Sequence, residues 1–209
     1  MTTSDPRVEI VARGYDAIAD TFAGLRDRIE GDPRREWAID LAGRLEPGAA
    51  VLELGCGSGA GETAMLAERF RLTGVDVSAE QIRRARERVP NGEFVLADVL
   101  EVELPAESFD AECSSYVFNH VPRERLRELM SRIRGWLQPG GLALNAFGVG
   151  DNPGWTGEWL GAEMFFAGFE PPENSRLVSA AGFEILRDEV VEFVEPEGPV
   201  RFQWILARR

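Results

Sequence analysis

Hydrophobic residues along this chain fall into short continuous runs and into longer stretches of helical spacing. The short runs, each bounded by Gly, Pro, Asp or Glu, predict strands over 50–54, 72–77, 93–97, 109–115 and 142–147. Apolar residues three or four positions apart predict helices between these strands, over 62–69, 78–89 and 122–137. Strands that alternate with helices predict a parallel sheet covered by helices on both faces.

The two ends of the chain add elements of other kinds. Helical spacing predicts one helix over 4–28 and a second that starts at Pro33 and ends near residue 47. After a predicted helix over 173–181, the runs 183–188 and 200–207 are separated by a short loop and predict an antiparallel hairpin. The stretch from Gly148 to Pro172 is rich in glycine, tryptophan and phenylalanine, and its irregular pattern predicts no sheet element.

The first predicted strand ends in a turn with glycine at every second position, Gly55-Cys56-Gly57-Ser58-Gly59. Such a turn favours positive φ, and the missing Cβ atoms let backbone N–H groups approach a ligand. The same residues also fit the dinucleotide fingerprint, so a nicotinamide or flavin site is an alternative. Glu53 lies two residues before Gly55, where a carboxylate repels a pyrophosphate and attracts an ammonium group.

Two further acids end the second and third predicted strands. Asp76 follows Gly55 by 21 residues, at the place where a carboxylate accepts both ribose hydroxyls of an adenosine. Ser78 then serves as the helix cap, so Asp76 is not needed for that role. Asp98 can accept from an exocyclic amine while the adjacent backbone N–H donates to a ring nitrogen. A nicotinamide site does not require this second acid.

These residues occur together in a fixed order. With Glu53-x-Gly55-x-Gly57-x-Gly59, Asp76, Ala97-Asp98-Val99, Phe109-Asp110 and Leu137-Gln138-Pro139-Gly140-Gly141, the chain resembles the class I S-adenosylmethionine-dependent methyltransferases. The resemblance implies a Rossmann-like, doubly wound α/β fold with seven strands in the order 3-2-1-4-5-7-6, the last strand antiparallel. It also implies S-adenosylmethionine as cofactor and S-adenosylhomocysteine as product.

The resemblance and the loops together give the expected site. Tyr15-Asp16-x-x-Ala19 resembles an N-terminal helix that folds over the cofactor in many small-molecule members. The expected cofactor contacts are Tyr15, Glu53, Gly55, Cys56, Gly57, Gly59, Asp76, Val77, Asp98, Val99 and Ser114. The expected substrate contacts are mainly aromatic: Phe22, Tyr116, Trp155, Trp159, Met164 and Phe165. We therefore expect one domain over 1–209, with helices over the cofactor in 1–46 and an inserted substrate lid in 148–172.

His120 is the only histidine of the chain and follows the fourth predicted strand. Its ordinary pKa suits a general base, which makes His120 the candidate catalytic residue. A histidine just before a proline also recurs in the resembled family as a packing residue at a helix start, so this structural role is the alternative. Glu158 and Glu163 are further candidates for orienting a cationic group or acting as a base.

Composition narrows the function. The net charge is −13, which disfavours nucleic acids and anionic membranes as partners, and the cluster Arg83, Arg84, Arg86 and Arg88 fits a solvated helix face. The absence of lysine excludes a P-loop and a pyridoxal Schiff base, and one histidine with two cysteines disfavours a metal site. Without a signal peptide or an apolar span, a cytoplasmic monomer or homodimer with reduced cysteines is expected.

The prediction is thus a metal-independent enzyme that methylates an oxygen or nitrogen of a small, partly apolar molecule. Three alternatives remain: a methyltransferase acting on a macromolecule, a non-catalytic S-adenosylmethionine-binding protein and, more distantly, a dehydrogenase.

Overall fold

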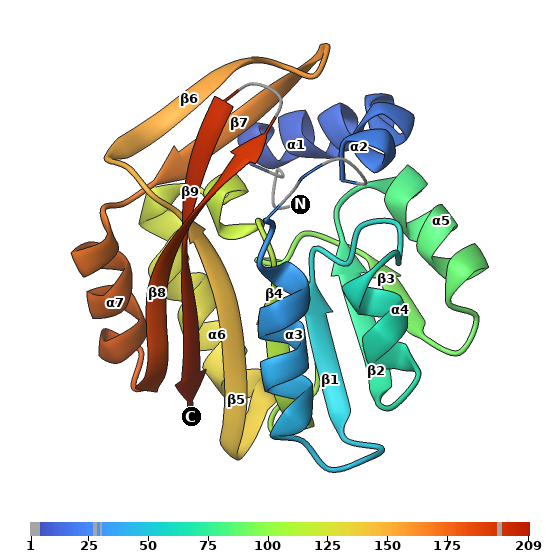
Figure 1. Ribbon diagram of the computed structural model, residues 1–209, viewed down its shortest axis with the longest axis vertical. Helices are drawn as coiled ribbons and strands as arrows, with labels where there is room; N and C mark the ends of the chain where they lie inside the picture. Colours follow the sequence, from blue (N-terminus) through green and yellow to red (C-terminus); the bar gives the residue numbers. More distant parts are fainter. Residues whose placement is uncertain (1–4, 27–28, 30, 196–197) are drawn as a thin grey trace.

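The computed structural model describes residues 5–26, 29, 31–195 and 198–209. Its centre is a sheet in the order β3-β2-β1-β4-β5-β9-β8 (Figure 1). Strands β1 to β5 of this sheet run parallel, and β9 pairs antiparallel with both β5 and β8. The bounds are β1 (Ala50–Leu54), β2 (Arg71–Asp76), β3 (Glu93–Leu96), β4 (Phe109–Ser114), β5 (Leu137–Gly148), β8 (Glu184–Glu195) and β9 (Gly198–Arg208). The predicted strand order and the antiparallel end are confirmed: β8 and β9 are the sixth and seventh strands of this sheet, because two other strands of the chain form a separate sheet.

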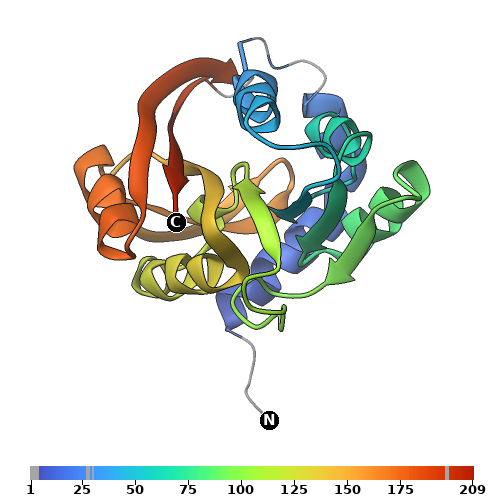
Figure 2. The same cartoon turned by 90° about the horizontal axis from the view of Figure 1, so that it is seen from below.

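Helices cover both faces of the sheet, and Figure 2 shows α3 (Arg34–Gly43) and α6 (Leu126–Trp136) on opposite sides. On one side α6 and α7 (Pro171–Ala180) bury residues such as Leu129 and Ile133 against the sheet. On the other side α3, α4 (Glu62–Ala67) and α5 (Ala79–Arg88) bury a second apolar cluster that includes Trp37. Two buried layers around one sheet make this a doubly wound α/β fold, as predicted.

The N-terminal region contains two helices where the sequence predicted one over 4–28. α1 (Pro6–Ala17) begins at Asp5, whose side chain accepts from the backbone N–H of Arg7, and ends at Ile18. The φ and ψ of Ile18, −98° and 11°, turn the chain into α2 (Ala19–Arg26). The hydrophobic spacing continues through this turn, so it does not reveal the break. Residues 4, 27 and 28 of the predicted helix lie outside the described residues.

The stretch predicted to be irregular is a β-hairpin, so that prediction was wrong. β6 (Asn152–Trp159) and β7 (Ala162–Gly168) form a separate two-stranded sheet joined by Leu160 and Gly161, both at positive φ. Two such residues make a tight hairpin turn, although leucine is an unusual choice there. The alternation of apolar and polar residues that marks a strand is hidden here because glycines stand where side chains would alternate. At Gly157 the Trp155 ring occupies the space of a side chain, since a Cβ there would lie 2.2 Å from that ring.

The hairpin and α1 lie together above the carboxyl ends of the parallel strands (Figure 1). Their contact is close, because a Cβ on Gly14 of α1 would lie 2.7 Å from Cε of Met164 and 2.8 Å from the carbonyl oxygen of Glu163. Val11 of α1 and Ile18, which follows α1, share a buried cluster with Phe165 of β7. The fold therefore covers the strand ends where a doubly wound sheet binds ligands. Among the described helices, none is long and apolar enough to cross a membrane.

Candidate active site

Two adjoining cavities lie under this cover. The sheet-end cavity is lined by the loops after β1 to β4, including Gly55, Asp76 and Asp98, and by α1. The hairpin cavity is lined by Trp159 and Phe166 of the hairpin and by Phe202 of β9. Five residues line both cavities and mark where they meet: Tyr15, Phe22, Arg34, Tyr116 and His120.

The glycine loop forms the floor of the sheet-end cavity. Gly55, Gly57 and Gly59 all have positive φ, between 53° and 72°, as the sequence predicted. Their lack of a side chain serves different purposes. A Cβ on Gly55 would lie 2.0 Å from Cγ2 of Val117, and one on Gly59 would lie 2.9 Å from Cα of Ala85 in α5. Only Gly57 opens toward free space, with its nearest neighbour 3.9 Å away. Close approach of a ligand is therefore a property of Gly57, while the other two glycines permit packing.

Asp76 holds the loop after β1 against the loop after β2. Its two carboxyl oxygens accept from the backbone N–H groups of Gly57 and Ser78, each at 2.9 Å. Ser78 in turn caps α5 by accepting from Gln81 N–H at 3.1 Å, as predicted. Burial raises the pKa of Asp76, and the backbone N–H bonds oppose that shift. Each carboxyl oxygen retains acceptor capacity beside these bonds.

Asp98 occupies the equivalent position after β3. One of its oxygens accepts from Leu100 N–H at 2.9 Å, and partial burial raises the pKa of the carboxyl group. Asp98 and Val99 both line the sheet-end cavity. A carboxyl group with spare acceptor capacity beside an apolar side chain suits a flat, hydrogen-bonding ring.

The opposite end of the sheet-end cavity carries both signs of charge. Glu53 is buried and accepts from the Thr63 hydroxyl at 3.0 Å. Arg34 lines the same cavity and forms an ion pair with Asp32, whose carboxylate also accepts from the Tyr116 hydroxyl at 2.7 Å. Burial raises the pKa of Tyr116, which keeps its phenol protonated as a donor. An acid and a guanidinium at one end suit a ligand with an ammonium and a carboxylate group.

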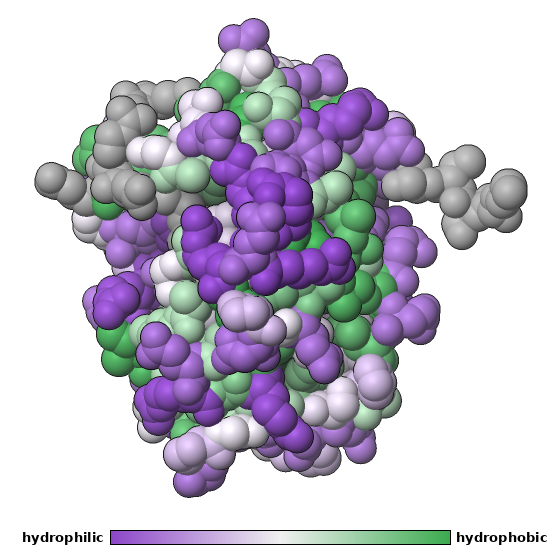
Figure 3. Space-filling view, turned by 90° about the vertical axis from the view of Figure 1, so that its right-hand side faces the viewer, coloured by the Kyte–Doolittle hydropathy of each residue, from purple (hydrophilic) through white to green (hydrophobic). Residues whose placement is uncertain are grey.

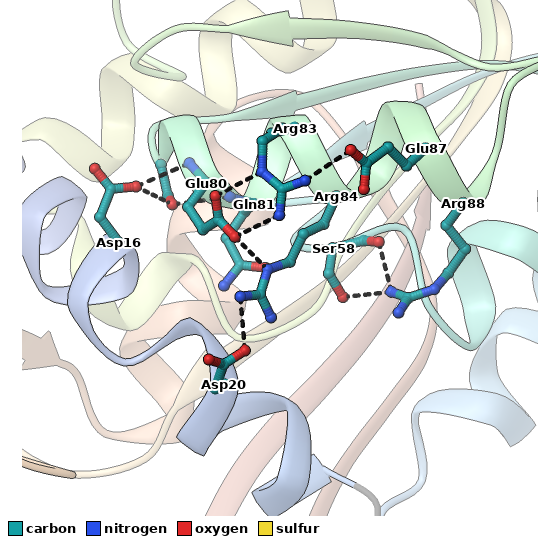
Figure 4. A network of polar contacts seen from close by, with 10 residues as sticks. Asp16, Asp20, Ser58, Glu80, Gln81, Arg83, Arg84, Glu87 and Arg88 are labelled. Atoms are coloured by element: carbon teal, nitrogen blue, oxygen red, sulfur yellow. Dashed lines mark hydrogen bonds and ion pairs between the residues drawn. The ribbon is translucent and has the colours of Figure 1, made fainter.

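Polar contacts fasten α1 and α2 to α5 beside the cavity. The Asp16 carboxylate accepts from the Ser78 hydroxyl at 2.6 Å and from Glu80 N–H at 3.0 Å, at the start of α5 (Figure 4). Arg84 donates to Asp20 of α2 at 2.7 Å, and Arg88 bonds both oxygens of Ser58 in the glycine loop. These bonds join the N-terminal cover to the loops that line the sheet-end cavity.

The side of the molecule on which α5 lies in Figure 1 is mostly hydrophilic (Figure 3). Arg83 pairs with Glu80 and Glu87, and Arg86 donates to the Phe94 carbonyl at 2.8 Å. Together with the contacts of Arg84 and Arg88, all four guanidinium groups have partners within the protein, as expected for a solvated helix face.

His120 connects three segments at the junction of the cavities. Its Nε2 lies 2.9 Å from the Tyr15 hydroxyl of α1, and its Nδ1 lies 2.8 Å from the Phe165 carbonyl oxygen of β7. The ring lies 4.7 Å from that of Phe166, centroid to centroid. Burial lowers the pKa of His120 to about 4, so the ring is neutral at pH 7.

The structure brings most of the predicted site residues together and leaves five out. The sheet-end cavity is lined by Tyr15, Phe22, Glu53, Gly55, Cys56, Gly57, Asp76, Val77, Asp98, Val99, Tyr116 and His120, and Trp159 lines the hairpin cavity. Gly59, Ser114, Trp155, Met164 and Phe165 line neither cavity. Met164 and Phe165 are buried against α1, Trp155 is 47% exposed, and Ser115 rather than the buried Ser114 faces the sheet-end cavity.

Five polar residues of the sheet-end cavity were missed from the sequence: Arg34, Glu62, Thr63, Gln81 and Ser115. Thr63 and Gln81 sit near the starts of α4 and α5, so helix starts that follow strand ends were the available signal. No local signal marks Arg34, which reaches the cavity from a helix distant in sequence.

Metal and thiol chemistry find no support in the described part of the chain. It contains no group of three or more His, Cys, Asp or Glu side chains arranged to hold a metal ion. Cys56 and Cys113 are both unpaired and buried, and burial raises the pKa of each thiol well above its ordinary value. Both cysteines are therefore protonated thiols at neutral pH rather than nucleophiles.

Comparison with known proteins finds methyltransferases similar to part of this chain. A family model described as a methyltransferase domain matches residues 51–141. The chain is 36% identical to trans-aconitate 2-methyltransferase of Rhodopseudomonas palustris over 116 aligned residues. This alignment covers 53% of this chain and 44% of that protein. The chain spans about half the length of the curated relatives it matches.

Solved structures share the fold over nearly the whole chain. The 1,6-didemethyltoxoflavin-N1-methyltransferase of Burkholderia thailandensis, solved with 1,6-didemethyltoxoflavin and S-adenosylhomocysteine, has a TM-score of 0.67 at 24% identity and covers 95% of this chain and 90% of that one. The cyclase SpnF has a TM-score of 0.73 at 19% identity, and the match covers 95% of this chain and 94% of SpnF. The matched domain model, the relatives and the strand order are all consistent with a class I S-adenosylmethionine-dependent methyltransferase.

Proposed function

We propose that this protein transfers a methyl group from S-adenosylmethionine to an oxygen or nitrogen of a small, partly apolar molecule. The observation that carries the proposal is the pair of adjoining cavities, one lined by acids at three strand ends and the other by aromatic rings. On this proposal 1–209 act as one methyltransferase domain, with 1–46 covering the cofactor and 148–172 acting as the lid over the acceptor.

The sheet-end cavity suits S-adenosylmethionine along its whole length. Asp76, buried and with acceptor capacity on both oxygens, would bind the ribose hydroxyls, and Asp98 would bind the adenine amine. Glu53 would attract the ammonium group and Arg34 the carboxylate. Gly57 is the loop position at which a Cβ is absent beside open space, which lets the backbone approach the ligand.

The hairpin cavity suits the methyl acceptor. Its aromatic lining favours a flat, partly apolar molecule. Arg34 is assigned to the cofactor carboxylate, and among the described residues the hairpin cavity is also lined by Arg201 and by the acids Glu192 and Glu195. A polycarboxylate such as trans-aconitate, the substrate named for the relative, would therefore find little net positive charge here. The supported acceptor is neutral or cationic.

Methyl transfer needs alignment more than chemical activation. S-adenosylmethionine supplies a methyl group on a positively charged sulfur, which is already a reactive electrophile. The protein would hold the acceptor in line with that methyl group and exclude water, functions that suit the cover of α1 and the hairpin. His120 lies where the two cavities meet and is the proposed base for an acceptor that must lose a proton.

The rival functions differ in observable ways. A methyltransferase acting on a nucleic acid would present basic side chains free to bind phosphates, whereas the arginines of α5 are bonded within the protein. A non-catalytic binding protein would retain the cofactor and form no product. SpnF, named as a cyclase, illustrates that this fold also serves other chemistry.

The test is product formation. The protein is incubated with S-adenosylmethionine and a panel of small phenols, amines and carboxylic acids, and S-adenosylhomocysteine is quantified. Release that depends on an acceptor, and that Asp76→Ala abolishes, supports the proposal. Binding of S-adenosylmethionine with no release over the whole panel would favour the non-catalytic alternative.

A further inference from the structure

The two hydrogen bonds of His120 determine which of its ring nitrogens carries the proton. The Phe165 carbonyl oxygen can only accept, so Nδ1, 2.8 Å away, must carry the hydrogen. A neutral imidazole has one N–H, so Nε2 is the acceptor and the Tyr15 hydroxyl donates to it at 2.9 Å. The lid hairpin therefore fixes the tautomer of the ring through its backbone.

Tyr15 lies on the Nε2 side of His120 and is the more exposed of the two residues. Its ring is only partly buried, while His120 is 7% exposed, and both residues line the two cavities. Edge-to-face contacts with the rings of Phe22 at 5.2 Å and Trp159 at 6.2 Å fix the position of the phenol. A phenol oxygen accepts as well as donates, so a hydroxyl in the cavity can donate to Tyr15 while Tyr15 donates to His120.

We propose that Tyr15 and His120 form a two-step proton relay for an acceptor that presents a hydroxyl group. Tyr15 is the residue that contacts the acceptor, and His120 is the final proton acceptor, held in the required tautomer by the Phe165 carbonyl. This inference rests on the proposed methyl transfer and narrows it to O-methylation.

The relay balances. The acceptor oxygen uses a lone pair to form the new O–C bond, and the electron pair of the broken C–S bond stays on sulfur. The hydroxyl proton of the acceptor moves to the Tyr15 oxygen as the Tyr15 proton moves to Nε2 of His120. Tyr15 ends neutral, and His120 ends as an imidazolium whose Nδ1–H still donates to Phe165. One positive charge is present before and after, so the site gains no buried charge.

The weak basicity of a buried histidine is sufficient for an oxygen acceptor. A hydroxyl oxygen becomes strongly acidic as it forms a third bond, so even a base with a pKa of about 4 removes its proton. A methylated amine remains a much weaker acid and would keep its proton in preference to this imidazole. The relay is therefore useful only when the acceptor is a hydroxyl group.

The single histidine makes this testable by nitrogen-15 NMR of histidine-labelled protein, since only one pair of ring signals is expected. Without any ligand, Nδ1 should carry a bonded proton and Nε2 none. Tyr15→Phe keeps the ring contacts, removes the donor, and should move the Nε2 signal. Tyr116→Phe, the matched change at the only other tyrosine, should leave both ring signals in place.

Phenol and anisole then test the contact with a hydroxyl group. In the presence of S-adenosylhomocysteine, phenol should move the Nε2 signal of the wild-type protein and leave that of Tyr15→Phe unmoved, because only the wild type can pass on the hydrogen bond. Anisole has the same ring without the proton and should have no such effect.

Several results would overturn the relay: a proton on Nε2, no response of Nε2 to Tyr15→Phe, no response to phenol up to its solubility, or an equal response to anisole. The first two need no cofactor. They are therefore readable even if the protein fails to bind S-adenosylmethionine, which calorimetry tests separately.

Discussion

The contact between α1 and the β6–β7 hairpin predicts opposite effects for one substitution at two helical glycines. Gly14→Ala places a Cβ 2.7 Å from Cε of Met164 and 2.8 Å from the backbone carbonyl of Glu163, whereas Gly24→Ala in α2 meets nothing within 4 Å. Alanine is favoured over glycine within a helix by up to about 1 kcal/mol. Overpacking against backbone typically costs about 1–3 kcal/mol. Gly14→Ala should therefore lower the free energy of unfolding by roughly 0–2 kcal/mol, and Gly24→Ala should raise it.

Urea unfolding of both variants and the wild type measures this difference, with calorimetric S-adenosylhomocysteine titration beside it. Since the Met164 side chain can move and the Glu163 carbonyl cannot, the hairpin must shift in Gly14→Ala, and affinity should fall for this variant alone. If Gly14→Ala stabilised the protein as much as Gly24→Ala and bound S-adenosylhomocysteine normally, α1 would not pack on the hairpin as described.

Three further predictions concern the interior of the site and the sheet. Gly55→Ala places a Cβ at positive φ, 2.0 Å from Cγ2 of Val117. Calorimetry should then show no cofactor binding, and the thermal midpoint of unfolding should fall. Unchanged binding would contradict the loop geometry. Burial raises the pKa of Glu112 in β4 well above its ordinary value, so as the pH rises the unfolded chain loses this proton before the folded protein does. The free energy of unfolding of Glu112→Gln, relative to that of the wild type, should therefore increase by up to about 1.4 kcal/mol per pH unit above pH 4.5. A pH-independent difference in urea unfolding would refute this. Burial lowers the pKa of His120 to about 4, so between roughly pH 6.5 and 4 only the unfolded chain takes up this proton. On acidification over this range, the free energy of unfolding of the wild type should fall by about 3 kcal/mol relative to that of His120→Gln. Parallel stability profiles of the two proteins against pH would exclude a neutral buried ring.

The sequence predicts those parts of the site that depend on local spacing. Glycines at alternate positions after a strand, and acids at the ends of the next two strands, lie at the carboxyl edge of any parallel sheet. Gly57, Asp76 and Asp98 therefore follow from the pattern. The strand order followed from the resemblance of these motifs to a family.

Contacts between distant segments could not be predicted in this way. The carbonyl of Phe165 on His120, the hydrogen bond from Tyr116 to Asp32, and the packing of Gly55 on Val117 each join residues that are distant in sequence. The hairpin was missed because glycines interrupt the alternation that marks a strand. Met164 and Phe165 were predicted as substrate contacts, yet apolar character alone does not distinguish a cavity wall from the packing between the hairpin and α1.

The most direct test of the account is calorimetric titration with S-adenosylmethionine and S-adenosylhomocysteine. Wild-type protein and Asp76→Ala are compared, with Glu184→Ala as the control, because Glu184 is an exposed acid of β8 that lines neither cavity. The account predicts that both ligands bind the wild type and Glu184→Ala alike and bind Asp76→Ala far more weakly. Absence of binding to the wild type at millimolar ligand, or equal binding to Asp76→Ala, would contradict the assignment of the sheet-end cavity.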